Sequence, residues 1–126
     1  MTTSARQAYV NAVVTNYVRL PGTPLRASRQ DRLFARILYE TRVPLRAVYA
    51  AFVLAIARRE VRSATRPRLP AIRTLRFFQG AIEEVVATGL DPAYVHYLAA
   101  RIKPLVAEKD TALRSRRDDP SDSRVS

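Results

Sequence analysis

The chain has 126 residues, 48% of them hydrophobic, which is enough for one domain with a modest core and excludes a compositionally disordered chain. It has no cysteine, which excludes disulfides, zinc knuckles and thiol catalysis. The formal net charge is +11 and unevenly distributed: residues 1–76 hold 15 arginines against three acidic residues, a net of +12, and residues 77–126 carry a net of −1.

The first two predicted helices lie in this basic half. Apolar residues recur at helical spacing over residues 5–20, up to the Pro-Gly-Thr-Pro break at 21–24. A second helix is predicted after Ser28, because Ser28 and Asp31 form a variant of the capping box. Its apolar stripe is expected to consist of Leu33, Phe34, Ile37 and Leu38. Its opposite face is expected to carry three arginines: Arg29, Arg32 and Arg36.

The third predicted helix, over about residues 44–59, is apolar on nearly every side. Such a helix is surrounded by others, so we expect it at the centre of the fold. Its apolar run at 47–57 has eleven residues, whereas a membrane span needs about 20. Residues 1–7 lack the apolar stretch of a signal peptide. We therefore expect a cytoplasmic protein without a membrane partner.

The segment 58–69 is rich in arginine, and its prolines prevent a helix from continuing, so we interpret it as a basic connector. A fourth helix is predicted over about residues 71–88, with Gly89 as its stop. A fifth begins at Asp91-Pro92 and is expected to kink or end at Pro104.

These elements predict an all-α fold, a compact bundle of about five helices around the central one. Residues 1–113 would form a single helical domain. Residues 114–126 are polar and charged and would form a disordered tail.

Catalytic groups are scarce. His96 is the only histidine, so no histidine-based metal cluster can form. Glu83 and Glu84 are adjacent and would point in different directions on a helix. No glycine-rich phosphate loop is present. We expect a protein that is not an enzyme and uses no cofactor or metal.

The arginines are the candidate functional residues. Guanidinium groups match phosphate oxygens bidentately, and clustered positive charge attracts polyanions through counterion release. The stretch 58–76 holds seven arginines against the single acid Glu60. The expected phosphate contacts are Arg29, Arg32, Arg36, Arg58, Arg59, Arg62, Arg66, Arg68, Arg73 and Arg76.

The predicted fourth helix has its charges in an unfavourable order. Arg73 and Arg76 would lie in its first turns and the adjacent glutamates in its later ones, against the helix dipole. An anion docked at this N-terminus, together with Arg68, would offset the cost. The sequence therefore indicates an anion site at the start of this helix.

Most aromatic residues follow the predicted core stripes. Phe77 and Tyr39 are the two expected to be partly exposed and available to stack on bases. His96, with its neighbours Tyr94 and Tyr97, is expected to have a structural role.

The order of features resembles the C-terminal domain of DnaD-like replication proteins and phage replisome organisers. That family shows an aromatic-x-x-x-Ile-x-x-x-Trp motif on a late helix, and Phe78, Ile82 and Val86 have this spacing, with phenylalanine in place of the usual tyrosine and valine in place of the tryptophan. The alanine-rich segment 45–59 is similar to the family's preceding helix. The resemblance covers about residues 9–86 and implies a helical module that binds DNA and helps to load a replicative helicase. The chain is also similar to proteins carried on bacterial mobile elements.

Two functions stay open at this point. The first is a DNA-binding accessory protein of replication or mobile-element maintenance, with weak sequence preference and a helicase or recombinase as protein partner. RNA stays an alternative ligand, because charge alone does not separate it from DNA. The second is a helical protein–protein adaptor subunit whose basic face binds an acidic protein partner. A binder of anionic membranes is disfavoured, since no wide apolar face flanked by lysines is predicted.

Overall fold

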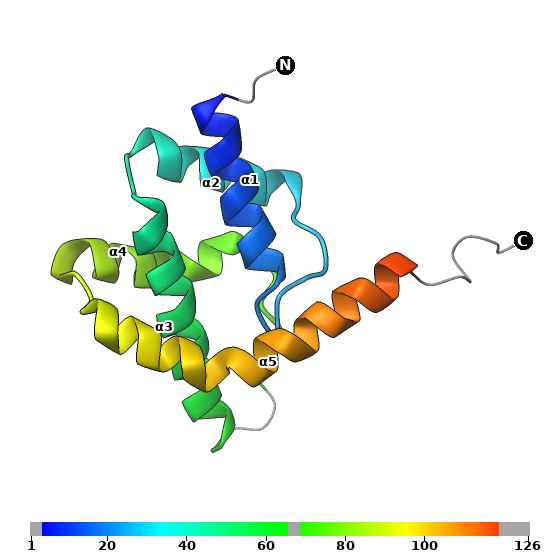
Figure 1. The fold of residues 1–126 in the computed structure, drawn as a ribbon. Helices are drawn as coiled ribbons and strands as arrows, with labels where there is room; N and C mark the ends of the chain where they lie inside the picture. The colour runs from blue at the N-terminus through cyan, green and yellow to red at the C-terminus, as the bar shows by residue number, and fades with distance from the viewer. Residues whose placement is uncertain (1–3, 66–68, 119–126) are drawn as a thin grey trace, which may run out of the picture.

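The computed structural model describes residues 4–65 and 69–118, and these contain helices but no strand (Figure 1). The expected all-α fold is therefore confirmed. The elements in chain order are α1 (Ala5–Val18), α2 (Arg29–Glu40), α3 (Leu45–Ser63), the 3-10 turn η1 (Leu75–Phe78), α4 (Gln79–Thr88) and α5 (Pro92–Asp118).

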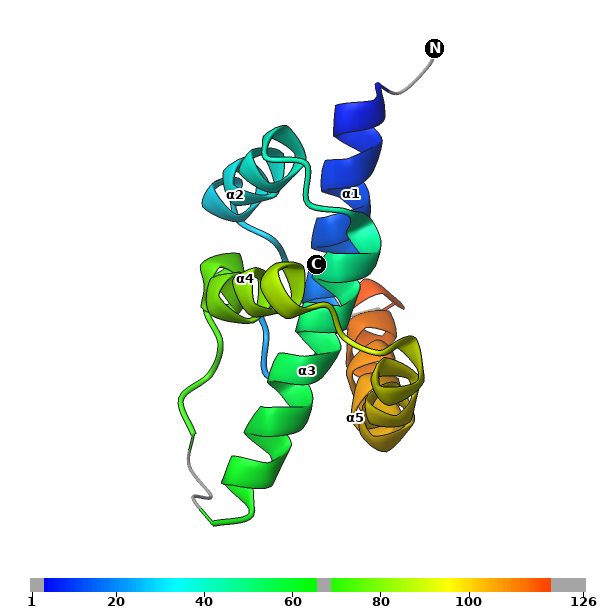
Figure 2. The same cartoon turned by 90° about the vertical axis from the view of Figure 1, so that its left-hand side faces the viewer.

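Helix α3 is the central element, as predicted, because α1, η1, α4 and α5 all pack against it. In Figure 2, α5 lies on one side of α3 and the segment 69–74 on the other. Helix α2 packs on α1 and η1. An aromatic cluster joins three of these elements: the Phe78 ring of η1 meets Phe52 of α3 and Tyr17 of α1 edge-on, with centroids 4.9 and 6.1 Å apart. All three residues are buried, so the cluster fixes η1 between α1 and α3.

Asp31 is a buried carboxylate that joins two distant segments. Only 2% of the residue is exposed. Its Oδ2 accepts a hydrogen bond from Ser28 N at 2.9 Å, and the Ser28 hydroxyl accepts from Asp31 N, which completes the predicted capping box of α2. Its Oδ1 accepts from Leu75 N at 2.8 Å. One side chain therefore caps the N-terminal ends of both α2 and η1.

The boundaries around the connector differ from the prediction. The basic stretch that begins at Arg58 is helical up to Ser63, the end of α3. The fourth helix does not start near residue 71: residues 69–74 are non-helical, and α4 begins at Gln79 after the turn of η1. Two long-range hydrogen bonds explain this, because Ile72 N donates to Gly22 O at 2.8 Å and Leu75 N to Asp31. These N–H groups bind partners elsewhere in the fold rather than carbonyls of their own segment.

Helix α5 contains Pro104 and continues beyond it (Figure 1). The proline removes one backbone donor and crowds the carbonyl of Ala100, and Figure 1 shows the helix bending near its middle. The helix extends to Asp118, past the expected domain end at 113. The remainder of the expected tail, 119–126, lies outside the described residues.

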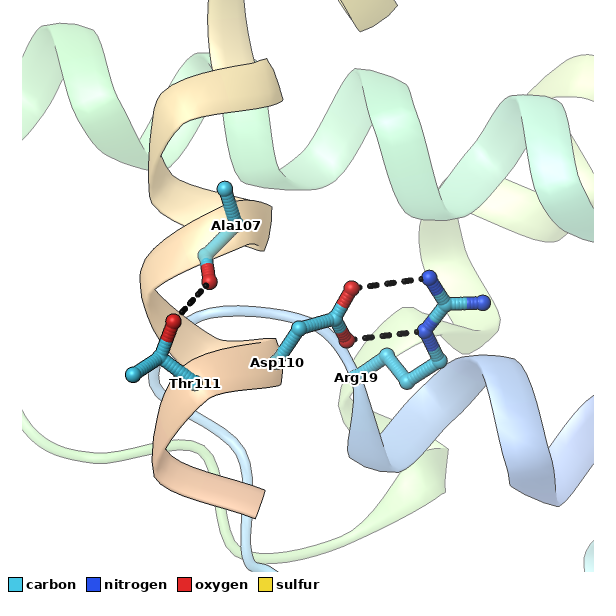
Figure 3. A network of polar contacts seen from close by, with 4 residues as sticks. All are labelled: Arg19, Ala107, Asp110 and Thr111. Carbon is cyan, nitrogen blue, oxygen red and sulfur yellow. Dashed lines mark hydrogen bonds and ion pairs between the residues drawn. The ribbon is translucent and has the colours of Figure 1, made fainter. Parts of the chain in front are cut away.

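Polar contacts attach the second half of α5 to the end of α1. Figure 3 shows Arg19 facing Asp110, with bonds of 3.0 Å from Nε and 2.9 Å from Nη2. One position earlier, Lys109 Nζ donates to the carbonyl oxygens of Leu20 and Thr23, both at 2.8 Å. A cation at this position satisfies carbonyls left free beyond the last turn of α1 and complements its dipole.

We predict that Asp31→Ala lowers the free energy of unfolding by about 2–4 kcal/mol, because it leaves the N–H groups of Leu75 and Ser28 without their acceptor. Asp31→Asn keeps one acceptor oxygen and should cost less. Urea unfolding followed by far-UV circular dichroism measures both. Asp91→Ala is the matched control, since this carboxylate accepts one exposed bond, from Ala93 N, and its loss should cost about 1 kcal/mol. Equal losses in the two alanine variants would contradict the joining role of Asp31.

A second prediction concerns pH. Arg19 holds the pKa of the Asp110 carboxyl below its ordinary value of 3.8, so the folded state favours the charged form. The pair therefore stabilises the fold above about pH 4, and this contribution disappears as the pH falls through the lowered pKa. Asp110→Asn should cost no more than about 1 kcal/mol at pH 7, because the pair is partly exposed, and nothing at pH 2. Urea unfolding at both pH values measures the free energy of unfolding of Asp110→Asn and of the reciprocal variant Arg19→Gln. A loss of stability that persisted in acid would contradict its assignment to the charged pair of Arg19 and Asp110.

Candidate nucleic-acid interface

The candidate arginines do not form a single cluster. Arg66 and Arg68 lie outside the described residues. The other eight belong to α2, to the carboxyl end of α3, and to the segment from residue 73 through η1. Figures 1 and 2 agree that α2 lies at one end of the molecule and the carboxyl end of α3 at the other. The non-helical segment 69–74, called the connector from here on in place of the predicted 58–69, lies between these two ends on the side of α3 away from α5 (Figure 2).

On α2, the three arginines are exposed, as predicted. Arg32 is tied to α1, because its Nη1 donates to Asn11 Oδ1 at 3.2 Å. Arg29 and Arg36 take part in none of the hydrogen bonds or ion pairs formed among the described residues. Their guanidinium groups are therefore available for a ligand.

The apolar stripe of α2 is narrower than predicted. Phe34 and Leu38 are buried, whereas Leu33 and Ile37 are 38% and 46% exposed. The reason is that α2 packs on α1 and η1, which cover only part of its surface. The guanidinium of Arg76 lies over the Phe34 ring, with Cζ 4.6 Å from its centroid. This cation–π contact places an arginine of η1 against α2.

The carboxyl end of α3 and the connector supply further arginines. Arg59 donates from Nη2 to Pro70 O, which fastens the connector to α3. Arg62 and Arg73 are exposed and, within the described part of the chain, their guanidinium groups form no hydrogen bond or ion pair. The name "basic side" is used below for six described arginines of α2, η1, the connector and this end of α3: Arg29, Arg36, Arg59, Arg62, Arg73 and Arg76.

Arg58 has a different role from Arg59, the next residue on α3. Its Nη1 and Nη2 donate to the two carboxylate oxygens of Glu84 at 2.8 and 2.7 Å. The hydrogen bonds hold the pKa of Glu84 below its ordinary value and raise that of Arg58. A bidentate pair of this kind neutralises the guanidinium, so Arg58 is engaged by α4 rather than left free.

The anion site expected at the start of the fourth helix is already filled by the chain. Leu75 N, at the start of η1, donates to the buried Asp31 carboxylate. Arg73 precedes η1 and belongs to the non-helical connector, so it is not in a first helical turn. The expectation of an external anion at this position is therefore wrong, and Asp31 supplies the negative charge.

The exposed aromatic residues are only partly those predicted. Phe77 is 43% exposed, as expected, and Tyr39 is half-buried with its ring 5.3 Å from that of Tyr9. Tyr94 and Tyr97, which the sequence did not single out as functional residues, are 47% and 54% exposed beside a groove between α3 and α5. Their spacing of three residues on one predicted helix was the available signal.

No family model, curated protein or solved structure matches this chain. The resemblance to DnaD-like domains thus stays a prediction. Of its three motif positions, Phe78 and Ile82 are buried in the core and Val86 is 56% exposed. Across residues 4–65 and 69–118, no helix is long and apolar enough to cross a membrane, and no three potential metal-ligating side chains gather.

The pairing of Arg58 yields a prediction for polyanion binding. Glu84→Gln raises the net charge by one and also weakens the hold on Arg58, so it should strengthen retention on heparin. Glu83→Gln makes the same change of charge, but Glu83 accepts only from Gln79 and releases no arginine. Elution on a salt gradient compares the two. Glu84→Gln should elute at the higher salt concentration. Identical elution of the two variants would show that the release of Arg58 from Glu84 does not strengthen binding to heparin.

Proposed function

We propose that the protein is a non-enzymatic nucleic-acid-binding accessory protein that contacts the phosphates of DNA through its arginines with weak sequence preference. The observation that carries the proposal is the set of exposed arginines whose side chains have no partner among residues 4–65 and 69–118: Arg29, Arg36, Arg62 and Arg73. Exposed and unpaired guanidinium groups bind phosphate oxygens without first breaking an internal contact.

The arrangement supports an extended ligand. Arg29 and Arg36 lie about 10 Å apart along α2 at 1.5 Å per residue. Arg73 precedes η1 beside α2, and Arg62 lies near the far end of α3. A polyanion that follows the connector would meet arginines along the length of the molecule, whereas a small anion would meet only one or two. The charges therefore favour a polymer of phosphates.

Replication or mobile-element maintenance is the process we propose, with a helicase or recombinase as protein partner. The ground for this part is the resemblance of residues 9–86 to DnaD-like and replisome-organiser domains. The basic side supports DNA binding independently of that resemblance, because it depends on charge and exposure alone.

A protein adaptor is the second candidate. A groove of about 650 Å³ between α3, α4 and the start of α5 has mostly apolar walls, including Val86, Leu90 and Val95. A partner helix could bind in such a groove. Competition separates the candidates: an acidic polypeptide such as polyglutamate should displace the ligand as well as heparin does if acidic protein is the natural partner, and far less well if nucleic acid is.

The test is fluorescence anisotropy with labelled duplex DNA, single-stranded DNA and RNA over a series of salt concentrations. Replacing Arg29, Arg36 and Arg73 together with alanine should weaken binding to every sequence about equally. The slope of log affinity against log salt should become shallower by about 2–3, since each lost phosphate contact removes about 0.9 on duplex DNA.

The matched control replaces three arginines outside the basic side: Arg6, Arg46 and Arg114. It makes the same change of net charge, so a smaller loss than in the first triple variant would locate the interface. Equal losses would reduce the proposal to a general charge effect. No binding of the wild-type protein to any of the three nucleic acids at low salt would refute it.

A further inference from the structure

A second groove lies between the carboxyl half of α3 and the first half of α5. Its volume is about 660 Å³. Leu54 of α3 and Leu98 and Ile102 of α5 line it and are almost fully buried, so its floor is apolar. The walls are open to solvent: Val61 is 65% exposed, and Tyr97 is 54% exposed.

The two tyrosines in this groove stack on each other and are about half exposed. Tyr94 and Tyr97 are three residues apart on α5 and therefore lie on the same face of the helix. Their rings are nearly parallel, with an interplanar angle of 21° and centroids 6.4 Å apart. Large exposed rings lose little side-chain entropy on binding and stack well on other flat rings.

Cationic groups accompany this aromatic surface. Arg101, one turn after Tyr97, places its Cζ 6.0 Å from the Tyr97 ring centroid, and its Nη1 donates to the Tyr97 hydroxyl at 3.4 Å. Across the groove, Arg58 lines the wall of α3. Because Arg58 is paired with Glu84, the groove combines an apolar floor and two exposed aromatic rings with one guanidinium group that no carboxylate neutralises among the described residues, that of Arg101.

One carboxylate, that of Glu60, also lines the groove. It would repel a phosphate but can accept a hydrogen bond from the exocyclic amino group of a base. The interior therefore suits a base, whereas the guanidinium group of Arg101 at its wall suits an adjoining phosphate. A duplex cannot use this surface, because its bases are already stacked and paired.

We propose that the groove lined by Tyr94, Tyr97 and Arg101 binds unpaired bases of single-stranded nucleic acid by stacking. This inference rests on the proposed nucleic-acid-binding function and names the form of nucleic acid that the protein prefers. Arg58 belongs to the groove, and Arg59 and Arg62 are its near neighbours on α3. A single strand with bases in the groove would therefore pass directly to the basic side.

The test uses the full chain, fluorescence anisotropy, and four ligands of equal length: single-stranded DNA, RNA of the same sequence, abasic single-stranded DNA and duplex DNA. Tyr94→Ala combined with Tyr97→Ala should lower the affinity for single strands by about five-fold or more, since that is the smallest effect expected from the loss of one stacked base. Its affinity for the duplex and its salt slope should not change. Tyr94→Phe combined with Tyr97→Phe retains the rings and should bind single strands like the wild type. Circular dichroism confirms the fold of each variant, which should persist because both tyrosines are about half exposed.

The wild-type protein should bind abasic DNA as weakly as the double alanine variant binds normal single strands. An unchanged affinity of the alanine variant for single strands, or tight binding of abasic DNA, would overturn the inference. The groove would then be a candidate binding site for a protein partner. In that case the arginine variants of the basic side would still lose affinity for all nucleic acids, and the proposed function would stand. Absence of binding to every ligand would instead reject the proposed function. The comparison of DNA with RNA identifies the sugar that is preferred.

Discussion

The buried carboxylate of Asp31 accepts hydrogen bonds from the start of α2 and from the start of η1. Helix α2 packs on α1 and η1, so this bond is one of the few links between α2 and the later half of the chain. The contact of Arg76 with the Phe34 ring lies at the same junction. Burial and the nearby negative charge of Asp31 raise the pKa of the Tyr17 hydroxyl, which keeps that core group neutral. The position of the arginines of α2 relative to those of the connector depends on this junction.

Positive charge in this protein has two uses. Some arginines hold the fold together: Arg19 joins α5 to α1, Arg58 joins α3 to α4, and Arg59 fastens the connector to α3. Others, such as Arg36 and Arg73, form no internal bond among the described residues. A net charge of +11 therefore overstates the charge that is free for a ligand. What matters for binding is which guanidinium groups lack an internal acceptor, and this depends on the neighbours that folding brings to each.

Helix α5 has different surroundings on the two sides of Pro104. Its first half contacts α3 and is bordered by grooves on both flanks, with Leu98 and Ile102 as its buried anchors. Its second half is held at the end of α1 through polar side chains, among them Lys109, whose pKa is lowered by burial. The Lys109 ammonium group donates hydrogen bonds to the carbonyl oxygens of Leu20 and Thr23. A helix packed through two apolar residues and a few polar ones leaves much of its surface uncovered. The exposed tyrosines of the α3–α5 groove follow from this sparse packing.

The sequence by itself determined the helical fold, the central position of α3 and the capping box at Ser28, because apolar periodicity and capping are local properties of the chain. It also identified exposed arginines on α2. It did not determine that Asp31 would cap η1, that the connector would be non-helical as far as Thr74, or that Glu84 would engage Arg58. These features join residues 26 to 50 positions apart, and their bonds exist only after the chain has folded. Periodicity reports which face of a helix is apolar, whereas the tertiary structure decides how much of that face is covered and which charges are paired.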